Sequence, residues 1–122
     1  MNIIFGDALN HVPNNYTVLE LDTFRLPPDG ALRTSYCVVD TVPLTDFPMM
    51  EALVKVHTDM MQAYRDQNWD YCEHAIAGLT GKWNGELDSF YNNLYQRVVD
   101  FKVNPPTANW TGVIDRTIAQ DA

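Results

Sequence analysis

The sequence predicts one small α+β domain, with strands in its first third and helices in the rest. Two β-rich runs, residues 16–24 and 34–42, flank a strong turn signal, and apolar residues recur at helical spacing after Pro43. Strands and helices that are segregated along a chain favour α+β over a parallel α/β sheet. We therefore expect an N-terminal antiparallel hairpin or three-stranded sheet in residues 1–43, packed on a C-terminal three-helix bundle in residues 44–116.

The β-rich part starts with a short apolar run, Asn2 to Phe5, and residues 8–15 are expected to form a loop. Residues 16–24 alternate with period two and are rich in β-branched and aromatic side chains, as in a strand. The sequence Pro27-Pro28-Asp29-Gly30 then predicts a turn, because proline cannot donate to a strand ladder and Asp-Gly favours turns. Residues 34–42 complete an antiparallel hairpin, to which the first run adds a third strand.

The first two helices follow from apolar spacing and from their caps. Thr45 or Asp46 can cap the first helix, and Pro48 lies in its first turn. Asn68 is a suitable N-cap for a second helix from Trp69 to Leu79. Apolar and aromatic side chains recur every three or four residues in both, which places them on one face of each helix; they are Phe47, Met50, Val54, His57, Met61, Tyr64, Trp69, Cys72, Ile76 and Leu79.

A third helix begins near Leu87 and stops at Asn104-Pro105-Pro106. Its apolar stripe consists of Leu87, Tyr91, Leu94, Val98 and Phe101, with Phe90 as an alternative to Tyr91. The glycine-rich residues 80–86 before it are expected to form a loop. Residues 110–114 are expected to fold back as an apolar cover, and residues 118–122 to fray.

Residues 62–75 are similar to the first turn of a tetratricopeptide-type helical hairpin, with an aromatic residue near the end of one helix, an acidic-polar turn, and Trp and Ala on the next helix. Farther along, Phe90 to Arg97, Asn104-Pro105-Pro106 and Trp110-Thr111-Gly112-Val113 resemble the helical tail that follows the catalytic domain of some class III adenylate cyclases. The resemblance spans about residues 49–113 and implies a tetratricopeptide-like bundle and a contact surface, without an activity. The chain is also similar overall to small uncharacterised marine bacteriophage proteins.

Charge and composition exclude several classes of function. The net charge is −8, from 16 acidic and 8 basic residues, which argues against binding to nucleic acid or to anionic membranes. The acids are scattered instead of forming a dense block, which disfavours a DNA mimic. We expect a cytoplasmic protein, because no signal peptide or membrane-spanning run is visible. Cys37 and Cys72 are expected to be buried thiols, and the sequence leaves open whether they pair.

No catalytic, cofactor or metal site is predicted. The chain has no G-x-S-x-G, P-loop or G-x-G-x-x-G motif. The cysteine, glutamate and histidine at 72–74 point in different directions on a helix, so they cannot share one ion. His57 lies on an apolar stripe and is expected to be a core histidine. Glu20 and Asp22 could form an acid–base pair on one strand face, although a solvated face is the simpler interpretation.

Four residues are candidates for binding a partner: Trp83, Asn84, Glu86 and Tyr91. They lie in or beside a glycine-flanked loop, and loops often carry recognition, with Trp and Tyr as frequent hot spots. The simpler alternative is that Trp83 fills a gap between helices.

Two classes of function remain. The first is a non-catalytic protein–protein interaction or assembly module, for example a phage accessory protein, with a protein partner or self-association. The alternative is a small-molecule-binding protein or enzyme with a pocket between sheet and helices. In such a pocket His57, Tyr64 or Trp83 would meet Glu20 or Asp22.

Overall fold

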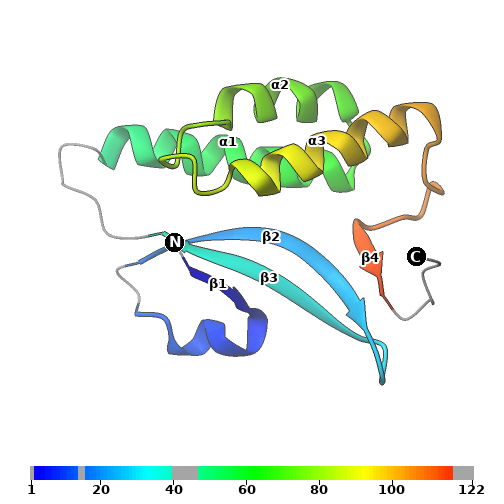
Figure 1. The fold of residues 1–122 in the computed structure, drawn as a ribbon, viewed down its shortest axis with the longest axis horizontal. Helices are drawn as coiled ribbons and strands as arrows, with labels where there is room; N and C mark the ends of the chain where they lie inside the picture. The colour runs from blue at the N-terminus through cyan, green and yellow to red at the C-terminus, as the bar shows by residue number, and fades with distance from the viewer. Residues whose placement is uncertain (1, 14–15, 40–46, 117–122) are drawn as a thin grey trace. The chain divides into compact units, whose positions relative to one another are not determined.

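A computed structural model describes residues 2–13, 16–39 and 47–116 of the chain. It contains a four-stranded sheet and three α-helices, which confirms the α+β class, with three strands before the helices and one after them (Figure 1). The chain divides into two compact units: a sheet unit, Met1–Thr41 with Gly112–Ala122, and a helical unit, Val42–Thr111. Within the described residues, no helix combines the length and the apolar character needed to cross a membrane.

The sheet unit contains the predicted hairpin and its third strand. The strand order is β1-β3-β2-β4, in which β3 (Ala31–Val39) pairs antiparallel with both β1 (Asn2–Phe5) and β2 (Thr17–Leu26). The hairpin turn is tighter than expected, because β3 begins at Ala31, three residues before the predicted start at residue 34. Gly30, with φ +70°, closes this turn by donating its N–H to the Leu26 carbonyl at 2.9 Å. The predicted end of the strand at residue 42 lies outside the described residues.

Two segments of the sheet unit differ from the sequence prediction. Residues Gly6–His11 form a 3₁₀ helix, η1, where a loop was expected. Residues Val113–Asp115 form strand β4, parallel to β2. The expectation of an apolar cover at 110–114 was therefore wrong for residues 113 and 114, although Trp110 does pack on the helices. The Arg25 Nε lies 3.8 Å from the Asp115 carboxylate across this pairing. A three-residue strand is too short to show a period-two pattern.

A bulge in β2 breaks the alternation that the sequence suggested. Glu20 pairs with Tyr36 and Thr23 with Thr34, so two residues of β2 stand opposite the single residue Ser35. Asp22 is one of these two and is buried, with its carbonyl accepting a hydrogen bond from the Ser35 hydroxyl at 3.1 Å. The expectation of one solvated face carrying both carboxylates was therefore wrong for Asp22.

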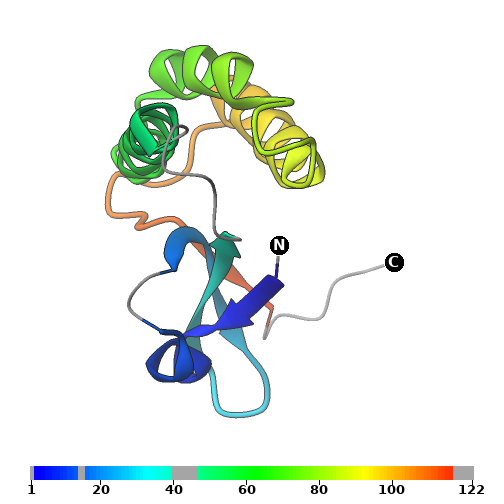
Figure 2. The same ribbon diagram turned by 90° about the vertical axis from the view of Figure 1, so that its left-hand side faces the viewer.

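The helical unit follows the predicted boundaries closely. Its helices are α1 (Phe47–Arg65), α2 (Trp69–Leu79) and α3 (Asp88–Val103). The predicted N-cap of α2 is confirmed, since the Asn68 side chain accepts a hydrogen bond from the Tyr71 N–H at 3.3 Å. The predicted caps of α1 lie outside the described residues. The three helices run alongside one another, and α2 packs on both α1 and α3 (Figure 2).

The core of the helical unit is built largely from the predicted stripes, and Met60, which was not predicted, is also completely buried. The buried side chains of this core include Met60, Met61, Tyr64, Cys72, Ala75, Ile76, Leu79, Leu87, Tyr91, Leu94 and Val98. Cys72 and Cys37 are both buried and neither forms a disulfide, as expected of small apolar side chains.

An aromatic cluster holds the segment after α3 against the helices. Trp69 stacks on Phe101 with ring centroids 5.1 Å apart, and Trp110 lies 5.0 Å from Tyr64 and 5.1 Å from Phe101. Aromatic pairs at these separations stabilise beyond the area that they bury. Gln67 reinforces the arrangement by donating from its side chain to the Thr107 carbonyl at 2.8 Å.

Candidate functional site

A buried polar network joins α1, the loop before α3 and α3 itself. The Trp83 indole donates to the Tyr91 hydroxyl at 2.9 Å, and that hydroxyl lies 2.9 Å from Nδ1 of His57. His57 and Tyr91 are 0% exposed and Trp83 is 6% exposed. Because an indole N–H can only donate, the Tyr91 oxygen accepts from Trp83. Its own hydrogen then points at Nδ1 of His57 when that nitrogen carries no proton.

This network is a packing feature, because its polar groups are turned toward one another inside the unit. The His57 ring lies 5.8 Å from the Tyr91 ring and 6.1 Å from the Phe90 ring. Among the described residues, no buried side-chain nitrogen or oxygen lacks a hydrogen-bond partner. The prediction that His57 is a core histidine with a satisfied hydrogen bond is confirmed, because it is completely buried and its Nδ1 contacts the Tyr91 hydroxyl.

The candidate partner-binding residues fall into two pairs. Trp83 and Tyr91 are buried in the network, so their side chains are not part of the surface, and the Trp83 indole is hydrogen-bonded to α3. Asn84 and Glu86 are exposed. Their part in partner binding stays a prediction.

Backbone geometry explains the shape of the loop that carries this exposed pair. Gly81 and Gly85 have φ of +83° and +76°, a region that residues with a Cβ rarely adopt. The Gly81 N–H donates to the Asp88 carboxylate at 2.7 Å, which ties the start of the loop to the first turn of α3.

The cysteine, glutamate and histidine at 72–74 diverge, as expected. Cys72 is buried with its Sγ 3.7 Å from the Met60 carbonyl, Glu73 pairs with Lys102 at 3.3 Å, and His74 is exposed. Burial raises the pKa of the Cys72 thiol to about 12, so the thiol stays protonated and unreactive at neutral pH. Over the described part of the chain, no group of His, Cys, Asp and Glu side chains is arranged to hold a metal ion.

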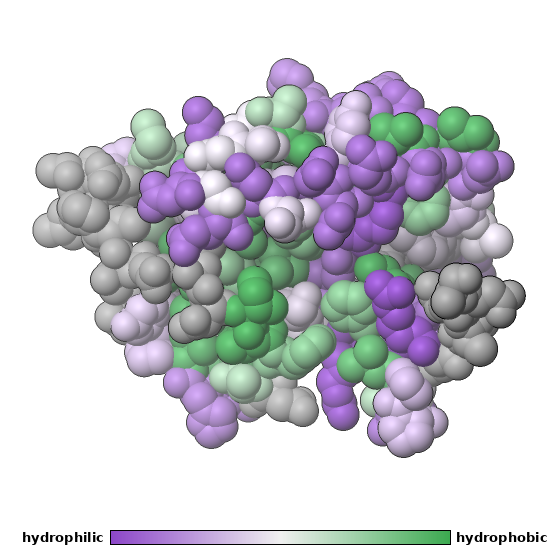
Figure 3. All heavy atoms as spheres, in the orientation of Figure 1, coloured by the Kyte–Doolittle hydropathy of each residue, from purple (hydrophilic) through white to green (hydrophobic). Residues whose placement is uncertain are grey.

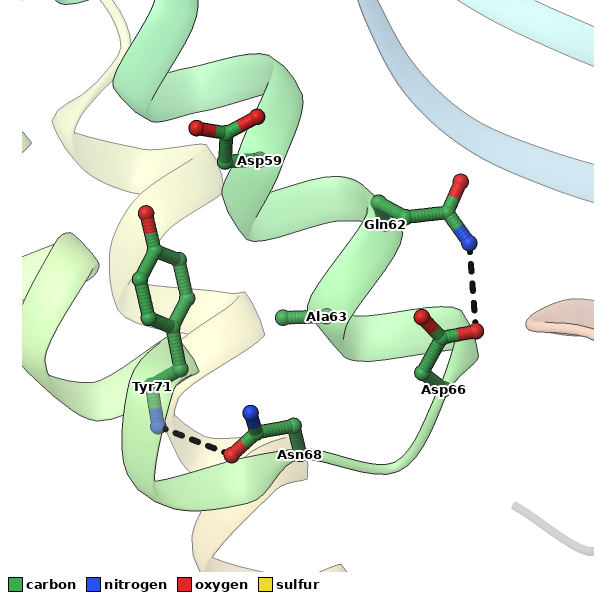
Figure 4. Close-up of a pocket in the computed structure, with 6 residues that line it drawn as sticks. All are labelled: Asp59, Gln62, Ala63, Asp66, Asn68 and Tyr71. Carbon is green, nitrogen blue, oxygen red and sulfur yellow. Dashed lines mark hydrogen bonds between the residues drawn. The ribbon is translucent and has the colours of Figure 1, made fainter.

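A surface groove between α1 and α2 was not predicted from the sequence. It has a volume of about 290 Å³ and is lined by Asp59, Gln62, Ala63, Asp66, Asn68 and Tyr71. Tyr71 and Asp59 lie on one side, Gln62 and Asp66 on the other, and Ala63 lies between them (Figure 4). The sequence does carry one signal for the groove, because residue 66 directly follows α1 and lies about two helical turns after residue 59, on the same face. The contribution of α2 depends on how the two helices pack.

The two carboxylates of the groove have different partners. Asp59 accepts from the Lys55 ammonium at 2.8 Å, one turn back on α1, and this contact raises the pKa of Lys55. Asp66 accepts from the Gln62 amide at 3.1 Å, and among the described residues it has no cationic partner. The side of the helical unit seen in Figure 3 is predominantly hydrophilic.

Comparison with protein-family models, with curated proteins and with solved structures finds no match to this chain. The resemblance of the helical part to tetratricopeptide hairpins and to cyclase tails therefore stays a prediction.

Proposed function

We propose that the protein is a non-catalytic interaction module that binds another protein through the groove between α1 and α2. The observation that carries this proposal is the composition of the groove, in which an exposed tyrosine and two carboxylates line one open surface. Tyrosine supplies a large contact area at a low entropic cost, and carboxylates supply directional charged contacts. Such a lining suits a protein surface better than an apolar small molecule, which needs an enclosed pocket.

The rest of the helical unit supports the same proposal. Of the histidines and the cysteine of this unit, His57 and Cys72 are each 0% exposed, and their polar atoms contact neighbouring core groups. His74 is exposed but is not among the residues that line the groove. A catalytic group has to reach its substrate within hydrogen-bond distance. The exposed polar side chains of the groove are instead available for contact.

Site-specific photo-crosslinking tests the proposal. Tyr71 is replaced by the photo-crosslinking residue p-benzoylphenylalanine, and the variant is produced in the cells in which the protein occurs naturally. The adducts that form on irradiation are then identified by mass spectrometry. The matched control places the same crosslinker at Tyr95, a tyrosine on α3 with similar exposure, 40% against 36% for Tyr71. We expect one discrete adduct from position 71 that is absent from position 95.

The identity of the crosslinked protein shows whether the partner is a second copy of the chain or a different protein. If it is a second copy, light scattering of the purified protein should show a dimer or a larger oligomer. Equal, diffuse adducts from positions 71 and 95, or no adduct from either, would contradict the proposed function.

A further inference from the structure

We propose that the groove binds two basic side chains of one extended segment of the partner, the first at Asp66 and the second at Asp59. This inference rests on the proposed function and names the partner's chemistry. The chain's own structure contains a local example of the contact, because the Lys55 ammonium already sits on the Asp59 carboxylate at 2.8 Å. The second basic group of the partner must therefore displace the Lys55 ammonium from the Asp59 carboxylate.

Charge favours a cationic partner at both positions. The chain has a net charge of −8, and the Asp66 carboxylate has only a neutral amide, that of Gln62, as its side-chain partner among the described residues. A long-range field of this sign raises the association rate of basic segments, and short contacts then fix their register.

Tyr71 adds an aromatic surface at the same place. Its ring lines the groove beside Asp59 (Figure 4), and the residue as a whole is 36% exposed. A guanidinium or ammonium group over a tyrosine ring gains a cation–π contribution in addition to its ion pair. Arginine fits best, because its planar group can stack on the ring while it donates to a carboxylate.

The spacing of the two carboxylates selects the shape of the segment. Asp59 and Asp66 are seven residues apart, and Asp66, the first residue after α1, still donates its N–H to the Gln62 carbonyl at 2.9 Å, as a helical residue would. At 1.5 Å per residue this separation is about 10 Å along the axis. In a polyproline II segment, residues three apart project on the same side about 9 Å from one another. Basic residues separated by two others therefore match the groove.

The test is a fluorescence anisotropy titration of the full chain with a fluorescein-labelled peptide containing Arg-Pro-Pro-Arg. The matched peptide has citrulline in place of each arginine, which keeps the shape and removes the charge. We expect the arginine peptide to bind, the citrulline peptide to bind at least about fivefold more weakly, and the difference to shrink at high salt.

Four variants locate the binding. Asp66→Asn and Tyr71→Ala should each weaken binding of the arginine peptide about threefold, through loss of an exposed ion pair and of a cation–π contact. Lys55→Met should tighten it about twofold to threefold, because it removes the competing ammonium from Asp59. Asp100→Asn removes the same unit of charge from an exposed site on α3 outside the groove, and should change binding by less than about 1.5-fold.

The inference is overturned by equal binding of the two peptides, by equal effects of Asp66→Asn and Asp100→Asn, or by weaker binding of Lys55→Met. Its failure is distinct from failure of the proposed function. Position 71 could give a discrete adduct with a partner segment that carries no paired basic residues. That result would support the proposed function and reject the inference of a basic segment.

Discussion

Removing the hydroxyl of Tyr91 tests the structural role of the buried polar network. In Tyr91→Phe the ring remains, but the Trp83 indole N–H loses its acceptor and Nδ1 of His57 loses its neighbour, each at 2.9 Å in the wild type. The sites at His57 and Tyr91 are completely buried, so water cannot reach them without a rearrangement.

The expected cost follows from counting the polar groups left unpaired. A buried donor or acceptor without a partner costs about 1–3 kcal/mol. Two such groups give an upper range of about 2–6 kcal/mol. Trp83 keeps 6% of its surface exposed, which gives its N–H partial access to water. We therefore expect Tyr91→Phe to lower the free energy of unfolding of the helical unit by about 2–3 kcal/mol.

Tryptophan fluorescence during urea unfolding measures this change in the helical unit alone. All three tryptophans of the chain, Trp69, Trp83 and Trp110, lie in that unit, so their emission does not report directly on the sheet. Tyr95→Phe is the matched control, because it removes an exposed hydroxyl from the same helix and should cost less than about 0.5 kcal/mol.

A double variant distinguishes the lost hydrogen bonds from a general packing defect. His57→Leu added to Tyr91→Phe replaces both polar partners by apolar groups, so the double variant should be less destabilised than the sum of the two single variants. If Tyr91→Phe costs no more than Tyr95→Phe, or if the two changes are additive, the hydrogen bonds are not what stabilises this core.

Three further predictions use the same unfolding assay. Burial raises the Cys72 pKa from 9.0 to about 12. As the pH rises above 9.0, the thiol loses its proton in the unfolded state before it does so in the folded state, so the free energy of unfolding should fall between pH 9.0 and 12. This fall should be smaller in Cys72→Ala. Asn68→Ala removes the cap of α2 and should cost about 1 kcal/mol, whereas exposed Asn93→Ala on α3 should cost nothing; equal effects would reject the cap. Gly78→Ala, in α2 with open space around its Cα, should stabilise by about 0.5–1 kcal/mol, while Gly81→Ala at φ +83° should destabilise by about 1 kcal/mol; changes of the same sign would contradict this.

Local signals made the helices predictable. The limits of α2 follow from Asn68 as a side-chain cap and from the glycines after Leu79, both of which act within a few residues. The burial of His57 was also predictable, because its position on an apolar stripe indicates the core side of α1. In each case the physical cause is contained in one short window of sequence.

Features that depend on distant residues were missed. Strand β4 gains its hydrogen bonds from β2, about ninety residues earlier, and three residues offer no periodicity of their own. The bulge at Asp22 is defined by the register against β3, so alternation within β2 alone could not show it. The groove combines side chains of α1 with Tyr71 of α2, and only the packing of the two helices brings them together.

Amide chemical-shift mapping tests the location of the binding surface most directly. The isotope-labelled chain is titrated with the Arg-Pro-Pro-Arg peptide, and the shift of each backbone amide is followed. Binding in the groove predicts that the largest shifts lie within residues 59–71, with little change across α3. Shifts concentrated in the loop at residues 80–87, or no shifts at a saturating peptide concentration, would contradict it.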